Sequence, residues 1–488
     1  MNVAQLLEAS ARYHAERPAL VAGNRRFTYR ELDDTCSVLA GRLRRLGLQP
    51  GDRLGVHLPN SAEFVLVYYA AQKLGVVPLS LNVTYAAEEI AYIVGDAAPK
   101  AVITAAGVAG NLPPRARMPG VRHVLDADEL ASLAGDGPAR ALDLDREATA
   151  AVLYTSATTG RPKGVMLSHA NIVSNAHATV HHLRMVPDDR GLCAVPMFHC
   201  FGQNFVMNAL ITAGGLLVVQ ERFVPDQFTE AVAHHRITLL YGVPTMYILF
   251  LSMDRTPDFS SVRIFFSAAA TLPTDVERRW SERYGLPVAQ GYGLTECSPF
   301  AAWNHDYAIR PGSVGTPIEN VEMRVVDGEG REVAEGELGE ILIKGPNVMK
   351  GYFNNPAATA EAVRDGWLHS GDIGYRDADG YYYLVDRVKD MINVAGFKVF
   401  PREVEEVLYR HAAVKEAAVV GVPDPVRGEA VKAFVVLHTA QAATVEALQA
   451  VCRGAVAAYK VPETIEFVAA LPKSPIGKIL KKELRRPR

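Results

Sequence analysis

The chain has 488 residues, of which 49% are hydrophobic and 22% are charged, and its formal net charge is −3. This length exceeds what one ordinary hydrophobic core supports, so two or more domains are expected. A nearly neutral chain has no general attraction to nucleic acid or to an anionic membrane surface, so neither is expected as a partner.

The cysteines and the N-terminal segment indicate the cellular compartment. The cysteines are odd in number, are scattered and form no CxxC pair: Cys36, Cys193, Cys200, Cys297 and Cys452. This pattern fits neither a disulfide framework nor a zinc site. Residues 1–8 lack the basic and apolar regions of a signal peptide, and no run of about 18 apolar residues occurs. We therefore expect a cytoplasmic protein without a transmembrane segment.

The first hundred residues alternate between helix-like and strand-like segments, which predicts α/β layers. Apolar residues recur at helical spacing from Leu32 to Leu46, and residues 53–58 have the pattern of a strand that ends in a turn. Residues 61–74 are apolar and long enough for a core helix. Residues 104–146 have weak periodicity and are expected to form surface structure around a strand or two.

The middle of the chain predicts a largely parallel sheet. Ser168 is a plausible N-cap for a helix that runs to His182, and an apolar helix is expected over Asn204 to Ala213. Short buried strands, with helical stretches between them, are expected at 216–220, 237–241, 262–267 and 288–290.

The last domain boundary is expected at residues 386–390, between a strand at 381–385 and a helix that begins near Phe400. The remaining residues, 390–488, are enough for a small domain that ends in a basic helix over 479–486. The predicted fold class is therefore α/β. A large N-terminal domain of layered β-sheets and helices, residues 1–386, is followed by a hinge at 387–389 and a small α+β domain.

A turn rich in hydroxyl groups follows the apolar run Ala151 to Tyr154. It reads Tyr-Thr-Ser-Ala-Thr-Thr-Gly-Arg-Pro-Lys-Gly from 154 to 164 and lacks the Walker A spacing. Hydroxyls and backbone N–H groups on such a turn can surround phosphate oxygens, and a lysine offsets their charge. The residues suited to this role are Thr155, Ser156, Thr158, Thr159, Gly160 and Lys163. The alternative is an ordinary solvated turn.

A second motif, Gly-Tyr-Gly-Leu-Thr-Glu at 291–296, follows the strand predicted at 288–290. Its glycines allow a flat ligand to approach the backbone, and Tyr292 offers a stacking face. Thr295 can donate to a phosphate, and Glu296 is a hard oxygen ligand suited to the Mg²⁺ of ATP. The alternative is a glycine turn with a capping glutamate.

Three more residues stand out near the C-terminus. Asp372 follows the predicted tight turn Ser370-Gly371, where its carboxylate could accept hydrogen bonds from both hydroxyls of a ribose. Arg387 could take part in the same site or form a surface ion pair. Lys478 is presented by a shaped Pro-Ile-Gly turn, although it could also be one more lysine in a cationic tail.

These motifs, in this order, resemble those of the adenylate-forming superfamily, which includes acyl-CoA synthetases, adenylation domains and beetle luciferases. The likeness extends from about residue 8 to residue 484 and is nearest to fatty-acid-type acyl-CoA ligases. It implies that ATP and coenzyme A are reactants and that Mg²⁺ is the cofactor. It implies that the nucleotide is bound by the hydroxyl-rich turn together with Ala269, Ala270, Gly291, Tyr292, Gly293, Asp372 and Arg387.

The resemblance also assigns catalytic roles to Lys478, Thr295, Glu296 and His199. In the family the matching lysine bridges the carboxylate and the α-phosphate during adenylation, where a cation stabilises developing charge. Glu296 is the implied metal ligand, and Asp372 with Arg387 is implied to bind the ribose. His199 is implied to lie near the acid carboxylate, although a lone histidine among apolar residues is more often a core side chain.

The implied acyl pocket contains no charged residue: Cys200, Phe201, Phe205, Phe266, Ala269, Gly291 and Pro299. Such a lining accepts an apolar tail and disfavours dicarboxylates and amino acids, whose second charge would be buried unpaired. Coenzyme A would pass Gly396, Phe397 and Lys398, and Lys389 matches the hinge about which the small, mobile domain turns between half-reactions.

Two places depart from the family pattern. Ala157 stands where the phosphate loop usually has glycine, and 267–272 reads Ser-Ala-Ala-Ala-Thr-Leu instead of a Gly-Ala-Ala-Pro-Leu-like turn. If the backbone at residue 157 requires a positive φ, the added Cβ costs about 1 kcal/mol.

The predicted activity is ATP-dependent ligation of a medium- or long-chain fatty acid to coenzyme A. The reaction would pass through an acyl-adenylate, release pyrophosphate and AMP, and use no covalent protein nucleophile. Alternatives are an aryl-CoA ligase, an adenylating enzyme that loads a carrier protein, a luciferase-like oxygenase and a non-catalytic adenylate-binding protein. Whether the chain forms a homodimer stays open.

Overall fold

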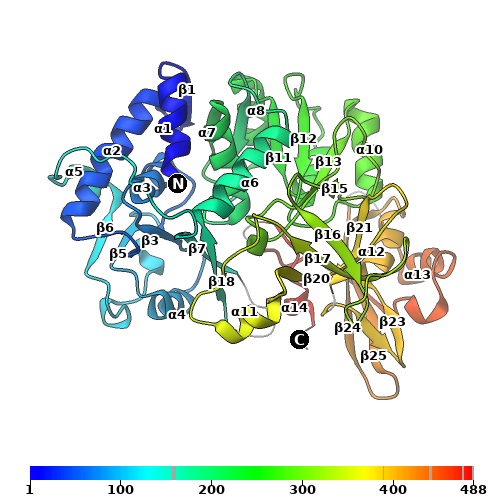
Figure 1. Cartoon of the computed structure of the whole chain (residues 1–488). Coiled ribbons are helices and arrows are strands. Elements are labelled where there is room, and N and C mark those ends of the chain that lie inside the picture. The colour runs from blue at the N-terminus through cyan, green and yellow to red at the C-terminus, as the bar shows by residue number, and fades with distance from the viewer. Residues whose placement is uncertain (156–160, 388, 439–441, 475–476, 486–488) are drawn as a thin grey trace.

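The computed structural model describes residues 1–155, 161–387, 389–438, 442–474 and 477–485 of the chain (Figure 1). Within these residues the architecture is α/β: a large N-terminal region of sheets and helices leads into a smaller C-terminal region, which confirms the predicted fold class.

The widest sheet in the described residues has nine strands and a parallel centre. In spatial order its strands are β15 (Thr316–Pro317), β14 (Ala302–Trp303), β13 (Val288–Tyr292), β12 (Ile264–Ser267), β11 (Leu239–Gly242), β9 (Arg190–Cys193), β10 (Leu216–Val219), β1 (Pro18–Ala22) and β2 (Arg25–Thr28). The central strands β11, β12 and β13 are buried along their whole length. Continuous apolar runs suit them because helices cover both faces of a parallel sheet.

A second sheet contains the strands that come before and after residues 156–160. In order it contains β18 (Gly351–Tyr352), β8 (Lys163–Ser168), β7 (Thr149–Thr155), β4 (Val77–Ser80), β3 (Arg53–His57), β5 (Ala101–Thr104) and β6 (His123–Asp126). Strands β7 and β8 are antiparallel, and Thr155 pairs with Lys163 where the turn begins and ends.

Two smaller sheets follow. The first contains β16 (Glu322–Val326), β17 (Gly339–Lys344), β20 (Trp367–Arg376) and β19 (Val363–Arg364), with β21 (Tyr382–Arg387) paired to β20. The second contains β23 (Phe397–Val399), β22 (Ile392–Val394), β25 (Gly428–Leu437) and β24 (Val414–Asp424), with β26 (Thr464–Phe467) paired to β25.

Helices pack between and around the sheets (Figure 1). Those of the N-terminal region are α1 (Ala4–Tyr13), α2 (Tyr29–Arg45), α3 (Ala62–Lys73), α4 (Ala87–Ala97), α5 (Ala127–Ser132), α6 (His169–His182), α7 (Ala209–Ala213), α8 (Pro225–His235), α9 (Pro244–Leu251), α10 (Thr274–Tyr284) and α11 (Pro356–Ala362). Those of the C-terminal region are α12 (Pro401–Tyr409), α13 (Val445–Arg453) and α14 (Lys481–Leu484). Ser168 caps α6 as predicted, because its side chain accepts from the Asn171 N–H. No helix of the described residues is both long enough and apolar enough to cross a membrane.

Two predicted helices have different bounds in the structure. The helix expected over Asn204 to Ala213 begins as a π-helical segment, Phe201–Asn208, and continues as α7. At Gly202 a Cβ would lie 2.4 Å from the Pro196 carbonyl oxygen, so the backbone packs closely where this segment begins. The spacing of apolar residues does not predict such a contact. The basic helix expected over 479–486 is limited to α14, because Ile479 pairs its backbone with Lys473 instead.

Buried apolar residues form a large cluster from Val3 to Tyr382, a smaller one within the N-terminal region from Val77 to Val152, and two clusters in the C-terminal region that begin at Ile392 and Ala418. The predicted domain boundary falls between these groups, and the exact division stays a prediction.

Candidate active site

Tyr292, Asp372 and Arg387 form one hydrogen-bonded group. Tyr292 ends β13, and its hydroxyl donates to Asp372 Oδ2 at 2.8 Å. Asp372 and Arg387 are paired across β20 and β21, and Arg387 Nε lies 3.0 Å from Asp372 Oδ1. Burial and the Asp372 charge both raise the pKa of Tyr292, so its phenol is a neutral donor at physiological pH.

The sequence predicted that Asp372 follows a tight turn. In the structure Asp372 lies inside β20 instead. Gly371 does have a φ of +69°, which is the local feature that suggested a turn, yet the strand continues through it. Likewise β13 extends through Gly291 and Tyr292, whereas the sequence predicted its end at residue 290. Thr295 and Glu296 lie in a single 3₁₀ turn, Thr295–Cys297. At Gly293 a Cβ would lie 1.6 Å from the Pro299 carbonyl oxygen, so this turn requires glycine.

Glu296 is connected to the hydroxyl-rich turn by Tyr352, a residue that the sequence analysis missed. The Tyr352 hydroxyl donates to Glu296 Oε1 at 2.9 Å, and the Lys163 ammonium lies 4.9 Å from the centre of the Tyr352 ring. Because Tyr352 is on β18, beside β8, the second sheet places Lys163 close to the carboxylate of Glu296. Of the other predicted phosphate-binding residues, Thr155 ends β7, whereas Ser156, Thr158, Thr159 and Gly160 lie outside the described residues, as does Ala157.

The carboxylate of Glu296 fits a divalent metal bound mainly through phosphate oxygens. Within the described residues no three His, Cys, Asp or Glu side chains converge. Mg²⁺ is commonly held by one or two carboxylates together with substrate phosphates, and Glu296 supplies one such carboxylate, while the nearby Lys163 could offset phosphate charge.

Lys478 reaches this site from the far end of the chain. The preceding Gly477 has a φ of +77°, and a Cβ there would lie 2.8 Å from Thr245 Oγ1 and 3.0 Å from the Val243 side chain. The Lys478 turn is therefore seated against the N-terminal part of α9 and the segment before it. Burial and the nearby Arg387 charge lower the pKa of Lys478 to about 8, while Asp372 acts in the opposite direction. Lys478 thus lies within electrostatic reach of both residues.

His199 also lies within electrostatic reach of Lys478. Burial, followed by the Lys478 charge, lowers the pKa of His199 to about 4, so the ring is neutral at physiological pH. Its Nδ1 accepts from the Phe201 N–H at 3.2 Å. The proton of the neutral ring is therefore on Nε2, which can donate to an anionic oxygen.

The residues predicted for the acyl pocket come from several elements. Phe201 and Phe205 are on the π-helical segment that follows His199 and Cys200, Phe266 is on β12, and Gly291 is on β13. Phe201, Phe205 and Phe266 are mutually packed, with 4.3 Å between the ring centres of Phe205 and Phe266. The Cys200 thiol accepts from the Asn204 amide at 3.3 Å. Pro299 lies in the segment after the 3₁₀ turn, and the loop after β12 holds Ala269 at a φ of +70° beside exposed Ala270. A positive φ at alanine is strained, which is common near functional sites.

The residues predicted to contact coenzyme A lie on the hairpin of β22 and β23. Gly396 has a φ of +91° at its tip, and Phe397 is 58% exposed and stacked on Tyr459. Lys398 is exposed, as is the predicted hinge residue Lys389. The hairpin bonds to Arg427 and Glu429 of its own region. In this arrangement Lys478 faces the site and the hairpin faces solvent.

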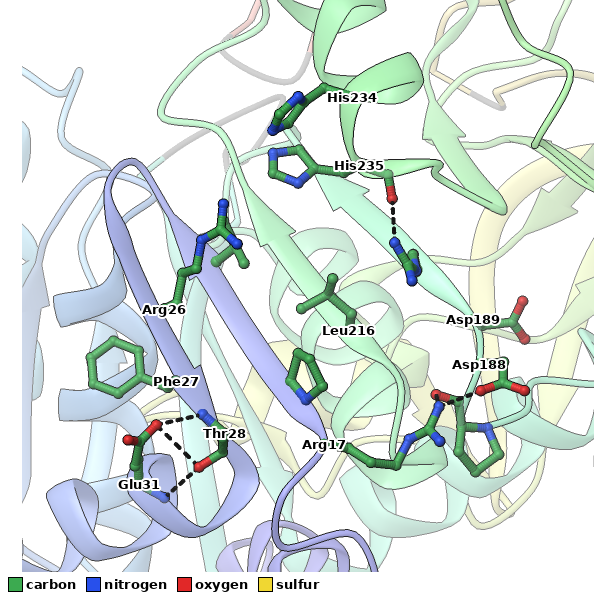
Figure 2. A pocket seen from close by; sticks show the side chains of 14 residues that line it. Arg17, Arg26, Phe27, Thr28, Glu31, Asp188, Asp189, Leu216, His234 and His235 are labelled. Carbon is green, nitrogen blue, oxygen red and sulfur yellow. Dashed lines mark hydrogen bonds and ion pairs between the residues drawn. The ribbon is translucent and has the colours of Figure 1, made fainter.

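A separate groove lies between the β1–β2 hairpin, β9 and the end of α8 (Figure 2). Figure 2 shows Arg17 bonded to Asp188 on one side and His234 with His235 on the other. None of the described residues predicted to bind nucleotide or acid lines this groove.

Comparison with known proteins defines the class. The family model "AMP-binding enzyme" matches residues 7–353, and the model of its C-terminal domain matches residues 403–478. The chain therefore belongs to the AMP-binding enzyme family, which is the adenylate-forming superfamily that its motifs resemble, and it is an enzyme of the acyl-CoA synthetase class. Enzymes of this class use ATP, Mg²⁺ and coenzyme A.

The curated relatives carry different acids in their names. The chain is 37% identical to a feruloyl-CoA synthase of Amycolatopsis sp., over 98% of this chain and 97% of the relative. It is 36% identical to a long-chain-fatty-acid–CoA ligase of Bacillus subtilis, over 98% and 93%.

Solved structures agree in fold. The anthranilate CoA ligase AuaEII, in complex with anthranoyl-AMP, has a TM-score of 0.94 at 30% identity, covering 99% of this chain and 96% of that one. MatB from Rhodopseudomonas palustris, 34% identical over 99% and 98% of the two chains, has a TM-score of 0.91 with ATP bound and 0.79 in its apo form. The arrangement of this chain is therefore closer to the ATP-bound form.

Proposed function

We propose that the protein converts an apolar monocarboxylic acid to its coenzyme A thioester through an acyl-adenylate. The observation that carries this proposal is the meeting of Lys478, from the end of the chain, with His199, Arg387 and Asp372. Positioning and charge neutralisation then supply most of the catalysis, because no protein nucleophile is required.

In the first half-reaction a carboxylate oxygen attacks the α-phosphorus of ATP, and the bond to the pyrophosphate oxygen breaks. Lys478 would lie between the carboxylate and the α-phosphate and offset the charge that builds up on them. The Nε2–H of His199 would hold the carboxylate, and Thr295 would donate to the phosphate. Glu296 would hold Mg²⁺, which neutralises the pyrophosphate charge.

The nucleoside would be held by the hydrogen-bonded group. The ring of Tyr292 offers a stacking face to the base, and Asp372 and Arg387 lie where the ribose hydroxyls could be bound. Each Asp372 oxygen keeps acceptor capacity beyond its present bond. Ala269, Ala270, Gly291 and Gly293 would supply backbone contacts.

In the second half-reaction the small region would turn about Lys389 and bring Gly396, Phe397 and Lys398 to the adenylate. The thiolate of coenzyme A attacks the acyl carbon, the bond to the phosphate oxygen breaks, and AMP leaves. The present exposure of Phe397 supports such a turn, since 58% exposure is unusual for a large apolar side chain.

The acid would be apolar, because the residues predicted to line its pocket are uncharged and the three phenylalanines among them, Phe201, Phe205 and Phe266, are buried. A fatty acid, the predicted substrate, and an aryl acid both satisfy this requirement, and the relatives named above include enzymes of both kinds. We keep the cytoplasm as the proposed location, because all five cysteines are buried free thiols.

The test is acid-dependent release of pyrophosphate and AMP. The purified chain, with Mg·ATP and coenzyme A, is given saturated acids of increasing length, aromatic acids, a dicarboxylate and an amino acid. We expect release with apolar monocarboxylates and little with the last two. Absence of AMP with every acid would overturn the proposal. Pyrophosphate release that yields no thioester with free coenzyme A would favour a carrier-protein acceptor.

A further inference from the structure

Phe266 is the centre of a buried aromatic cluster next to His199. It lies on β12, is 1% exposed, and contacts rings from four other parts of the fold. Its ring centre is 4.3 Å from that of Phe205, 5.9 Å from Phe201 and 5.2 Å from Trp303, with which it is stacked at 16°. Tyr241 and Phe300 complete the cluster at 6.3 and 6.4 Å. A ring held on so many sides cannot move aside without displacing its neighbours.

The tip of the same ring is pressed against the backbone of the neighbouring strand. At Gly291 on β13, a Cβ would lie 2.3 Å from Phe266 Cζ. Gly291 directly precedes Tyr292, so this contact lies one residue from the group proposed to bind the nucleotide. The space that the absent side chain of Gly291 would leave for a ligand is thus taken by Phe266.

These two observations bear on the length of the acid. An acid bound at His199 with its apolar body between the π-helical segment and the sheet meets Phe201, then Phe205 and Phe266. Tyr241 and Trp303 pack against Phe266, and their Oη and Nε1 atoms are buried with no hydrogen-bond partner among the described residues. An alkyl chain extended past Phe266 would displace packed rings and lie against unpaired polar atoms, both of which are unfavourable.

We propose that Phe266 is the floor of the acid pocket and restricts this enzyme to compact apolar acids, either aromatic or short-chain. The inference rests on the proposed function and names its substrate class. It departs from the medium- or long-chain fatty acid predicted from the sequence. Phe266 acts here as a specificity-determining residue, and its tip against Gly291 sets the depth.

The experiment compares acid profiles of the wild type and Phe266→Ala by pyrophosphate release, over saturated acids of 2–18 carbons, benzoic acid and cinnamic acids. In the wild type, kcat/KM should peak at compact acids and fall steeply with longer chains. In Phe266→Ala the ratio of kcat/KM for a 12-carbon acid to that for a compact acid should rise about tenfold or more, because several methylenes gain space.

The matched control is Phe265→Ala. Phe265 is the preceding residue, is 2% exposed, and packs on Phe259 and Trp280 on the other face of β12. It should lower stability by a similar amount without changing the ratio between long and compact acids. If Phe266→Ala does not fold, Phe266→Leu is measured instead, with a smaller shift in the same direction.

A second variant tests the depth contact itself. Gly291→Ala should reduce kcat/KM for every acid, and combining it with Phe266→Ala should restore turnover of compact acids, because the clash is with that ring. A wild-type profile that peaks at 12 or more carbons would overturn this inference and leave the proposed function intact, as would an unchanged ratio in Phe266→Ala. If no acid gave AMP release with the wild type or any variant, both this inference and the proposed function would be overturned.

Discussion

Tyr292, Asp372 and Arg387 are joined to one another by a side-chain hydrogen bond and an ion pair, whereas Lys478 is held through its backbone. Its N–H donates to Ser474 Oγ, and within the described residues its ammonium has no hydrogen bond or ion pair. Asp372 by contrast has a partner on each oxygen. The side proposed to bind the nucleotide is thus preorganised by the pairing of β20 with β21, and the lysine side is seated mainly by the position of its backbone. A group attached in this way can leave and return at low cost, which an enzyme with two half-reactions requires.

The largest effect on activity is expected from removing the charge of Lys478, the loosely held residue. Lys478→Ala should lower acid-dependent exchange of pyrophosphate into ATP by about 100-fold or more, because a charge aimed at the transition state is lost. Transfer of a preformed acyl-adenylate to coenzyme A should change several-fold at most. Half-reactions measured separately with a substrate found in the acid screen check this, and Lys478→Arg should retain part of the exchange. Equal losses in both half-reactions would contradict the difference between the two sides.

On the preorganised side the expected loss is smaller and takes another form. Asp372→Asn removes the anion that pairs with Arg387 and accepts from Tyr292, and it should raise KM for ATP about 10- to 100-fold. It should also lower the free energy of unfolding by about 1–3 kcal/mol, since the guanidinium loses its partner.

The matched control for Asp372→Asn is Asp379→Asn. Asp379 is paired with Arg310 at 2.7 Å, but its side chain is 66% exposed. An exposed pair contributes little, so stability should change by about 0.5 kcal/mol or less and KM for ATP should not change. Thermal unfolding and ATP titration distinguish the two variants. Equal effects would mean that Asp372 has only a structural role.

The pH dependence also separates the two sides. Because the pKa of Lys478 is lowered to about 8, its ammonium loses charge as pH rises through that value in the free enzyme. If the charged form is the active one, kcat/KM for ATP in the exchange reaction should fall about fivefold between pH 8 and pH 9, and about tenfold for each pH unit above that. Lys478→Arg should remove this decline, because a guanidinium stays protonated. A decline that persists in the arginine variant would assign it to another group.

The sequence predicted the elements whose signals are local. The apolar runs of β10 to β13, the helix α6 with its Ser168 cap, and the two-region α/β fold all follow from burial and capping. Residue type and the local turn likewise singled out Glu296 and Lys478, whose roles stay predictions.

The sequence could not predict features that depend on partners far along the chain. Asp372 resembles a turn residue because of Gly371, but pairing with β21 keeps it in a strand. Tyr352 has no local sign of function, since its contact with Glu296 spans 56 residues. The depth set by Phe266 depends on rings from several elements, so a list of apolar residues could not distinguish a deep pocket from a shallow one.

The smallest effect is expected at a contact that joins the two regions. Thr274 at the start of α10 donates through its N–H and Oγ1 to Glu406 Oε2 on α12, at 3.3 and 2.9 Å. This bond belongs to the arrangement in which Lys478 faces the site, so Glu406→Ala should weaken that arrangement. Because exposed bonds contribute about 1 kcal/mol or less, adenylation should slow about two- to fivefold, while thioester formation from a preformed adenylate stays constant or rises. Glu282→Ala, which removes a pair with Arg278 inside α10, should leave the ratio of the two rates unchanged. If Glu406→Ala slowed both half-reactions equally, the contact would serve stability alone. The loose attachment of Lys478 would then have no measurable effect on the rotation of the small region between the two half-reactions.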